Sequence, residues 1–497
     1  MTKQEALNIL KGKIAETQAI GQLSNVFHWD STTDGGAPKT SFGYRSASIA
    51  FSSGEQYKRI VADDTRAAFE TLEGDASLTS EEAAMARDFA RAYRLNSAIP
   101  KAELEKFSAL TTEADNAWRA AKDKSDYASV ESYFARIFDF VRRVADWRGY
   151  KDHPYDALLD EYEIGLTVRT LDGFFGELRG TIVPLLRKIA HSDAKPRKVK
   201  ERFLPGQQRI LTYRLADMVG FDSSRGRVGE TVHPYSMMIN PDDIRIAIAY
   251  NGDLLSGLYS TIHECGHAIY NQGVRKDLYP YGLSDSMSMG MHESQSRFYE
   301  NIIGRSRAFT GVLLRLLKVR FPYFQDWSAD ELYSAVNIAD PSLIRTEADE
   351  LTYCLHIMVR YEIEKKILQG EVNTNELPEL WNALYKEYLG ISPKKHSEGV
   401  LQDTHWSGGA VGYFPTYALG TAYAAQLLNA LSKSVDWKGD IAKGNFSKVH
   451  GWLKENVHAH GGLFLPEEVL LKATGERFNP VYYTKYLNEK FGAIYSV

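Results

Sequence analysis

Apolar residues recur at three- and four-residue spacing along most of this chain, and that period is typical of amphipathic α-helices. One helix is predicted after Thr79 and Glu82, which have capping-box spacing, and it is expected to end near Pro100. Another is predicted from Ser129 to Arg148, where one face carries an apolar stripe made of Phe134, Phe138, Val141 and Ala145. The pattern therefore indicates a mainly helical protein.

The pattern changes between Gly220 and Gly252, where glycine, serine and proline cluster. Within this region, the segment from Asp243 to Tyr250 carries isoleucines at every second position, which predicts a β-strand with one apolar face. An Asn-Gly pair then predicts a turn, and the helical period resumes after it. We therefore expect a small sheet inserted into a helical body, which together with the next helices occupies about residues 230–305.

Composition narrows the classes of function. The 497 residues include 64 acidic and 59 basic side chains, a formal charge of −5, so no excess of positive charge points to nucleic acid or an anionic membrane as a partner. The locally basic segment from Lys195 to Arg202 is interpreted as a solvated loop. Only two cysteines occur, and neither a signal-peptide pattern nor a run of about 18 apolar residues is present. These features favour a cytoplasmic protein.

The residues that carry chemistry follow the predicted turn. His263 and His267 are four positions apart, so on a helix both imidazoles lie on one face and can bind the same zinc ion. Glu264 is rotated by about 100° from His263, which lets its carboxylate reach a metal-bound water as a general base without binding the metal. This HEXXH pattern predicts a zinc-dependent hydrolase.

A catalytic zinc ion held by two histidines needs a third protein ligand and one position for water. The metzincin spacing is excluded, because it requires a glycine and a histidine where this chain has Tyr270 and Gly273. A more distant glutamate is then required, and Glu293 is the candidate, with Glu300 as the alternative. Cys265 is expected to point away from the metal and to be a packed side chain.

Three further segments combine polar and aromatic residues without a helical period. They contain His233, Arg345 and His405, and Tyr413 follows the last of them closely. Taken singly, each segment is more often structural. Together, in a zinc-dependent hydrolase, they could supply a group that stabilises an oxyanion and a clamp for the substrate.

With these motifs the sequence resembles the carboxypeptidase Taq family of metallocarboxypeptidases, and its trypanosomatid members most closely in overall texture. The resemblance extends from about residue 29 to 490. Besides HEXXH it rests on Trp29-Asp30, the segment Tyr155–Glu163, motifs similar to HPF, DXRXT, HES(M/Q), IRXEAD and GXXQDXHW, and a terminal region around Trp452–Asn456. Two positions depart from the family pattern: Tyr235 replaces the Phe of HPF, and Ala247 replaces the Thr of DXRXT.

The resemblance implies a saddle-like, mainly α-helical fold with a small β-sheet edging a deep active-site groove, similar to neurolysin and angiotensin-converting enzyme. It implies a homodimer that removes single C-terminal amino acids from peptides with a free C-terminal carboxylate. It also implies roles for individual residues: zinc ligands His263, His267 and Glu293, catalytic base Glu264, carboxylate-binding Arg245 and Arg345, and groove residues His233, His405 and Tyr413, of which the last two are candidates to stabilise the oxyanion.

We therefore expect residues 1–497 to form one catalytic unit, because the expected site residues extend from His233 to Tyr413. The expected cofactor is Zn²⁺, with Co²⁺ or Mn²⁺ as substitutes. An oligoendopeptidase or dipeptidyl carboxypeptidase on the same scaffold is the alternative activity. A metal-binding scaffold without turnover is a third hypothesis, from a different class.

Overall fold

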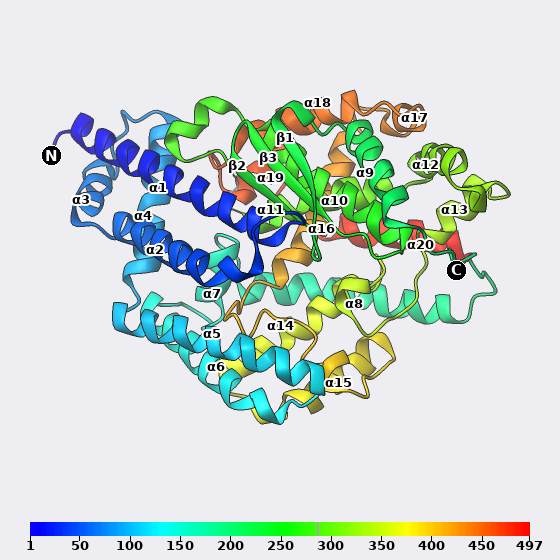
Figure 1. Cartoon of the computed structure of the whole chain (residues 1–497), viewed down its shortest axis with the longest axis horizontal. Helices are drawn as coiled ribbons and strands as arrows, with labels where there is room; N and C mark the ends of the chain where they lie inside the picture. The colour runs from blue at the N-terminus through cyan, green and yellow to red at the C-terminus, as the bar shows by residue number, and fades with distance from the viewer. Residues whose placement is uncertain (286–287) are drawn as a thin grey trace.

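The computed structural model describes residues 1–285 and 288–497, and most of these residues are helical (Figure 1). The first part of the chain forms helices α1 (Lys3–Thr32), α2 (Phe42–Ile60), α3 (Asp63–Leu72), α4 (Ser80–Ser97), α5 (Lys101–Lys124), α6 (Ala128–Arg148), α7 (Asp156–Tyr162), α8 (Val168–Ala190) and α9 (Pro205–Val219). Three strands follow, β1 (Gly226–Glu230), β2 (Tyr235–Asn240) and β3 (Asp243–Ile248). The remainder forms α10 (Leu254–Gly273), α11 (Met289–Arg297), α12 (Arg307–Arg320), α13 (Ala329–Ala335), α14 (Tyr353–Gln369), α15 (Leu377–Leu389), α16 (Pro415–Leu431), α17 (Trp437–Ala442), α18 (Ser447–Asn456), α19 (Pro466–Thr474) and α20 (Val481–Tyr495).

The two helices predicted most clearly from the sequence are confirmed. Thr79 caps α4 through a reciprocal pair of hydrogen bonds with Glu82, which satisfies two backbone N–H groups at the start of the helix. α6 buries its apolar stripe, and Phe134 and Phe138 are at most 1% exposed. Burial of each of these phenylalanines stabilises the fold by roughly 1.5–3 kcal/mol.

The basic segment singled out in the sequence lies outside the helices. The basic segment from Lys195 to Arg202 is a loop between α8 and α9, as predicted, and two of its charges, Arg197 and Lys198, form ion pairs with Asp326 and Asp340.

In residues 1–285 and 288–497, no helix combines the length and the apolar character needed to cross a membrane.

A three-stranded sheet lies where the sequence pattern changes, with β3 at its centre. β1 pairs with β3 in parallel, and β2 pairs with it antiparallel. Ile244 and Ile246 are fully buried in the apolar cluster that also contains Leu258 of α10. Because side chains alternate along a strand, Arg245 and Ala247 lie on the opposite face of the sheet.

The strand predicted from Asp243 is confirmed as β3. β1 and β2 were not individually predicted, because most of their side chains are only partly buried and their sequences do not alternate apolar and polar residues. β1 carries glycines at Gly226 and Gly229, where a Cβ atom would lie within 3.0 Å of a neighbouring aromatic ring, so these positions are selected by close packing and leave no periodic signal.

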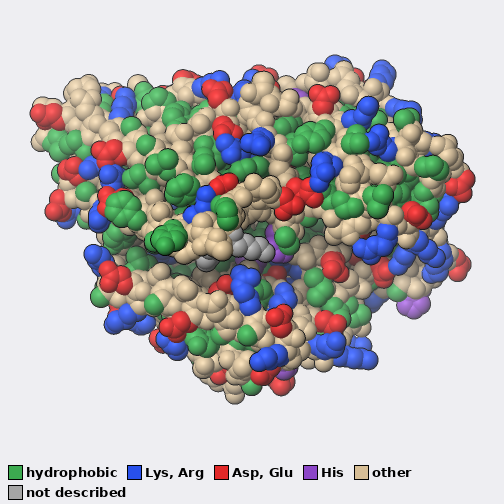
Figure 2. All heavy atoms as spheres, in the orientation of Figure 1, with side chains coloured by type: hydrophobic (Ala, Val, Ile, Leu, Met, Phe, Trp, Pro, Cys, Tyr) green, Lys and Arg blue, Asp and Glu red, His purple; other side chains and the backbone are tan. Residues whose placement is uncertain are grey.

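The molecule has an upper and a lower part in the view of Figure 1. The sheet, α10 and α12 lie in the upper part, α5, α6 and α15 lie in the lower part, and α7 lies at the level between them. One apolar cluster extends through both parts and includes Phe138 of α6 and Leu258 of α10. Figure 2 shows a hollow that crosses this face between the two parts, with a histidine side chain visible in it.

Candidate active site

Both histidines of the HEXXH pattern lie on α10. The start of this helix is capped by Asp253, which accepts hydrogen bonds from two backbone N–H groups of the first turn. α11 packs against α10 and brings Glu293 to the histidines. Glu293 Oε2 lies 3.6 Å from His263 Nε2 and 3.5 Å from His267 Nε2, and the ligand atoms of the three residues all lie within 4.8 Å of one another.

These three side chains fit a divalent metal ion. Zinc binds histidine nitrogen and carboxylate oxygen at about 2.0–2.2 Å, and tetrahedral geometry then separates neighbouring ligand atoms by roughly 3.4 Å. The two N···O distances are close to that value. In residues 1–285 and 288–497 this is the only group of three histidine, cysteine or acidic side chains whose ligand atoms converge in this way.

The close contact between α10 and α11 depends on Gly266. A Cβ atom at this position would lie 2.7 Å from the backbone of Gln295 and Ser296, closer than real side chains approach. The neighbouring Cys265 is fully buried, and burial raises the pKa of its thiol. Cys265 is therefore a packed side chain, as predicted, and Gly266 allows the helix with Glu293 to come within reach of the histidines.

A chain of hydrogen bonds orients His267. Asn271 donates from Nδ2 to Asp285 at 3.1 Å, so its Oδ1 faces His292 and accepts from Nε2 of that ring at 3.2 Å. In a neutral His292 ring, Nδ1 then accepts from His267 Nδ1–H at 2.6 Å. This arrangement leaves the lone pair of His267 Nε2 facing Glu293, as a metal ligand requires.

Glu300 takes a different position from Glu293. Its Oε2 accepts from His263 Nδ1 at 2.9 Å, and Arg297 and Arg305 each donate to its carboxylate at 3.2 Å. Although burial opposes ionisation, Arg297 and the hydrogen bond from His263 lower the pKa of Glu300 to about 2. Of the two glutamates considered as the third ligand, only Glu293 faces both histidines, and Glu300 orients the far side of one of them.

Glu264 follows His263 on α10 and is only 6% exposed. Within the described part of the chain its carboxylate has no hydrogen-bond partner, whereas Glu293 accepts from Arg297 Nε at 2.7 Å. Burial raises the pKa of Glu264 to about 7, with His263 opposing the shift and the negative charges of Glu293 and Glu300 adding to it. A carboxylate that titrates near neutral pH is suited to accept a proton and return it.

Arg345 belongs to a second charged cluster, in which its side chain is almost completely buried. Its Nε and Nη2 donate to Asp403 Oδ1 at 3.0 and 2.9 Å, and its Nη1 donates to the hydroxyl of Tyr353 at 3.3 Å. Arg360 donates to the other carboxylate oxygen of Asp403 at 2.9 and 2.7 Å. Within the described part of the chain these bonds use three of the five N–H donors of the Arg345 guanidinium, so two can bind a further anion.

His405 and Tyr413 lie next to this cluster, in the loop before α16. Their ring centroids are 5.7 Å apart, and His405 Nε2 is 3.4 Å from the hydroxyl of Tyr417. Burial lowers the pKa of His405 to about 4, so the ring is neutral at pH 7. The pKa of Tyr413 is raised, first by burial and then by Glu293, while Arg345 opposes the shift. Tyr413 is therefore close enough to interact electrostatically with both Glu293, the candidate metal ligand, and Arg345.

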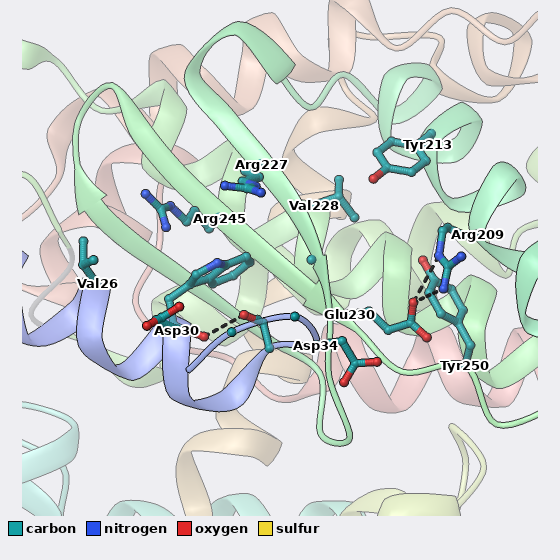
Figure 3. Close-up of a pocket in the computed structure, with 15 residues that line it drawn as sticks. Val26, Asp30, Asp34, Arg209, Tyr213, Arg227, Val228, Glu230, Arg245 and Tyr250 are labelled. Atoms are coloured by element: carbon teal, nitrogen blue, oxygen red, sulfur yellow. Dashed lines mark hydrogen bonds and ion pairs between the residues drawn. The ribbon is translucent and has the colours of Figure 1, made fainter. Parts of the chain in front are cut away.

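Arg245 and His233 are not brought together with these groups. Arg245 projects from the opposite face of the sheet, where its guanidinium lies 5.5 Å from the Trp29 ring and its Nη2 lies 2.6 Å from Asp243. It lines a cavity of about 390 Å³ between the sheet and the end of α1 (Figure 3). His233 is exposed in the turn before β2. Among the described residues, neither side chain has a hydrogen bond or ion pair with the candidate metal ligands.

Sequence reasoning missed the roles of several supporting residues. Asn271 and Arg297 each lie four positions after a candidate ligand, on the same helix face, and that spacing was a usable signal. Asp403 had no such signal, because it meets Arg345 across 58 positions of sequence. His292 was visible only as a neighbour of Glu293, and its contact with His267 depends on how the two helices pack.

Two histidines and a glutamate around a common point, with a glutamate base beside them on a mainly helical scaffold, define an HEXXH metallopeptidase. Residues 9–491 match the family described as carboxypeptidase Taq (M32) metallopeptidase. The chain is 40% identical to Carboxypeptidase 1 of Bacillus subtilis, over 99% of this chain and 98% of that protein. It is 34% identical to Thermostable carboxypeptidase 1 of Thermus thermophilus, over 100% of both chains.

Solved structures agree with this assignment. The M32 carboxypeptidase from Deinococcus radiodurans matches with a TM-score of 0.95 at 31% identity, and Trypanosoma cruzi metallocarboxypeptidase 1 matches with 0.94 at 31%, each over 99% of this chain and 100% of the other. The chain therefore belongs to the carboxypeptidase Taq (M32) family and is a metallocarboxypeptidase. The expected fold, mainly helical with a small sheet, is confirmed. The identities do not single out the trypanosomatid members, because the Bacillus protein is 40% identical and the trypanosome protein 31%.

Proposed function

We propose that this chain is a zinc-dependent carboxypeptidase that removes single C-terminal amino acids from peptides. The observation that carries the proposal is the convergence of His263, His267 and Glu293 within 4.8 Å, with Glu264 next to them on α10. A donor set of two imidazoles and one carboxylate would suit Zn²⁺, and Co²⁺ or Mn²⁺ could substitute.

A divalent ion held by these residues supplies Lewis acidity, which polarises a peptide carbonyl and lowers the pKa of a coordinated water toward about 7. Glu264, whose carboxylate is buried and otherwise unpartnered among the described residues, accepts the proton of the attacking water and returns it to the leaving amine. Tyr413 or the neutral ring of His405 donates a hydrogen bond to the carbonyl oxygen as negative charge develops on it.

Selection of the chain terminus requires a group that binds a free carboxylate, and we assign this role to Arg345. Asp403 and Tyr353 fix the plane of its guanidinium, and the two remaining N–H donors can bind both oxygens of a carboxylate. Arg245 is less suited, because it lies on the opposite face of the sheet against Trp29. His233, exposed in its turn, has no support for a role at the groove.

The test is mass spectrometry of the products from one peptide supplied with a free or an amidated C-terminus. The zinc-loaded protein is expected to release single residues from the free peptide and to leave the amide intact. Dipeptide products or internal cuts would favour the alternative, a dipeptidyl carboxypeptidase or oligoendopeptidase. Zinc binding without cleavage of either peptide would favour the scaffold hypothesis.

Three further properties belong to the same proposal. We propose that the whole chain acts as one catalytic unit, because the residues assigned to the site extend from His263 on α10 to Tyr413 before α16. We propose a homodimer, on the resemblance to the family, which light scattering of the purified protein would test. A cytoplasmic location is supported by the two cysteines, Cys265 and Cys354, which are both buried and free.

A further inference from the structure

The segment Tyr155–Glu163 supports the family resemblance but has no part in the mechanism described above. It consists of α7 and one flanking residue on each side, and we refer to it as the α7 segment. Both of its ends take part in hydrogen bonds of a buried glutamate. One end reaches the substrate side of the site, the region of Arg345, His405 and Tyr413. The other end reaches the metal side, the region of His263, His267 and Glu293.

At the N-terminal end, Tyr155 donates a hydrogen bond to Glu364 of α14. The same carboxylate accepts from Trp406 Nε1 at 2.7 Å and from the backbone N–H of Gly412 at 2.9 Å. Trp406 directly follows His405, and Gly412 directly precedes Tyr413. Glu364 therefore joins the α7 segment to both flanks of the loop that carries the two candidate oxyanion donors.

The loop also packs directly on the α7 segment. Gly412 has a φ of +100°, and a Cβ atom there would lie 3.0 Å from the carbonyl oxygen of Leu158. The rings of Tyr162 and Tyr413 meet edge to face with centroids 5.2 Å apart. These contacts are independent of Glu364, and they place Tyr413 against the last turn of α7.

At the C-terminal end, Glu163 is 2% exposed and accepts three hydrogen bonds from residues that the structure describes. Two come from the start of α11, from Ser288 Oγ at 2.6 Å and from the backbone N–H of Gly290 at 3.0 Å. The third comes from the hydroxyl of Tyr423 on α16 at 3.2 Å. Glu293 lies one turn further along α11, so Glu163 fixes the start of the helix that presents the third metal ligand.

We propose that the α7 segment is a positioning element, which sets the loop carrying His405 and Tyr413 against the helix carrying Glu293 through two buried carboxylates, Glu364 and Glu163. The inference rests on the proposed function, because it takes these residues as the substrate side and the metal side of one site. It assigns no catalytic step to either glutamate. Glu364 acts through the loop that carries His405 and Tyr413, and Glu163 acts through α11.

The two glutamates differ in whether a glutamine can replace them. Two of the three donors to Glu364, the Trp406 indole and the Gly412 amide, cannot accept a hydrogen bond, so the NH₂ of a glutamine would face a donor. For Glu163, the hydroxyl of Tyr423 is the only donor to Oε1 among the described residues, and it can accept from a glutamine NH₂ while Oε2 keeps its two bonds. Glutamine should therefore be tolerated at position 163 and not at position 364.

Two affinities separate the two ends of the segment. The Kd for Zn²⁺ is measured by competition with a chromophoric chelator, and the Kd of a fluorescent peptide with a free C-terminus is measured at saturating Zn²⁺ in a Glu264→Gln background, where no turnover is needed. Glu163→Ala is expected to raise the Zn²⁺ Kd about 10-fold or more, in line with the effect of residues that support metal ligands. Glu163→Gln is expected to restore it.

Glu364→Gln is expected to raise the peptide Kd about 10-fold, the effect of one unpaired buried donor, and to leave the Zn²⁺ Kd unchanged. If that variant does not fold, Tyr155→Phe removes a single hydroxyl and is expected to raise the peptide Kd by a smaller factor. Glu161→Gln is the matched control, because Glu161 lies on the exposed side of the same segment, paired with Arg148, and both affinities should stay unchanged.

The proposal is contradicted if both glutamate variants change the two affinities by the same factor, as a general loss of stability would, or if neither affinity changes. Failure of the proposed function would be seen separately, as a wild-type protein that binds Zn²⁺ but cleaves no peptide. The split between the two affinities needs no cleavage, so it still decides the role of the α7 segment in that case.

Discussion

The metal side and the substrate side of the site hold buried charge in opposite balance. On the metal side, three carboxyl groups, those of Glu264, Glu293 and Glu300, lie near two guanidiniums, those of Arg297 and Arg305, so acidic groups outnumber the guanidiniums. On the substrate side, Asp403 lies between Arg345 and Arg360, so positive charge is in excess. Each side therefore lacks the charge that its proposed ligand brings, a divalent cation in one case and a terminal carboxylate in the other.

The comparison also shows how each side is held in place. The metal side is built on two helices in backbone contact at Gly266, and the hydrogen bonds of its two histidines reach residues 25 and 37 positions away, on α11 and on the π-helix after it. The substrate side is built on loops, and its order comes from buried side chains distant in sequence, such as Asp403 and Glu364. We expect substitutions on the metal side to change metal affinity and substitutions on the substrate side to change peptide affinity.

On the substrate side, the largest effect is expected at Arg345. Arg345→Lys keeps the charge but loses the planar pair of donors, so KM for a peptide with a free C-terminus should rise about 100-fold, with a smaller change in kcat. Steady-state kinetics on this variant and on Arg245→Lys check the assignment. An equal rise in KM for Arg245→Lys would show that the opposite face of the sheet takes part in binding the carboxylate.

A smaller effect is expected at Glu300, which orients His263 without facing His267. Glu300→Ala should weaken Zn²⁺ binding about 10-fold, because it removes the acceptor of His263 Nδ1–H and leaves the candidate ligands in place. Competition with a chelator measures this change. Glu293→Ala is the comparison and should lose far more affinity, so equal losses in the two variants would make Glu300 a ligand.

The smallest measured change, a few degrees in Tm, is expected from the pH dependence of stability at Glu163. Burial raises the pKa of this carboxyl from its ordinary 4.5 to about 7, while its hydrogen bonds from Ser288, Gly290 and Tyr423 oppose the shift. Between these values the unfolded chain ionises first, so the folded state loses stability as pH rises through that window, by at most about 3 kcal/mol. Glu163→Gln removes this loss.

Scanning calorimetry at pH 5 and pH 8 tests the prediction. The Tm of the Glu163→Gln variant relative to that of the wild type should be a few degrees higher at pH 8 than at pH 5. If the difference in Tm between the variant and the wild type is the same at pH 5 and pH 8, the raised pKa of Glu163 is contradicted. If the variant's Tm relative to the wild type is lower at pH 8 than at pH 5, the pKa of Glu163 is lowered by folding and not raised.

Part of this architecture could be predicted from the sequence. Capping at Thr79, the stripe on α6, the isoleucine alternation in β3 and the HEXXH pattern are local signals, and each is found in the structure. The π-helix Phe298–Gly304 after α11 has no such signal, and it lies where Glu300 turns toward His263.

The rest depends on tertiary packing. The sequence left Glu293 and Glu300 as alternatives, because only the approach of α11 to α10 decides which carboxylate faces both histidines. Arg245 and Arg345 both occur in motif-like surroundings, but the alternation of side chains in β3 directs Arg245 away from α10, and Asp403 holds Arg345 on the substrate side. Long-range partners of this kind leave no periodic trace in a single sequence.

The central claim is that Glu264 acts as the base beside a metal ion that it does not bind, and one measurement tests it directly. Glu264→Gln is prepared, its zinc content per chain is determined by mass spectrometry of the native protein, and its turnover of a free-carboxylate peptide is compared with that of the wild type. We predict one zinc ion per chain in both proteins and a loss of turnover of about 10²–10⁴-fold in the variant. Loss of the zinc ion, or turnover close to that of the wild type, would contradict the account.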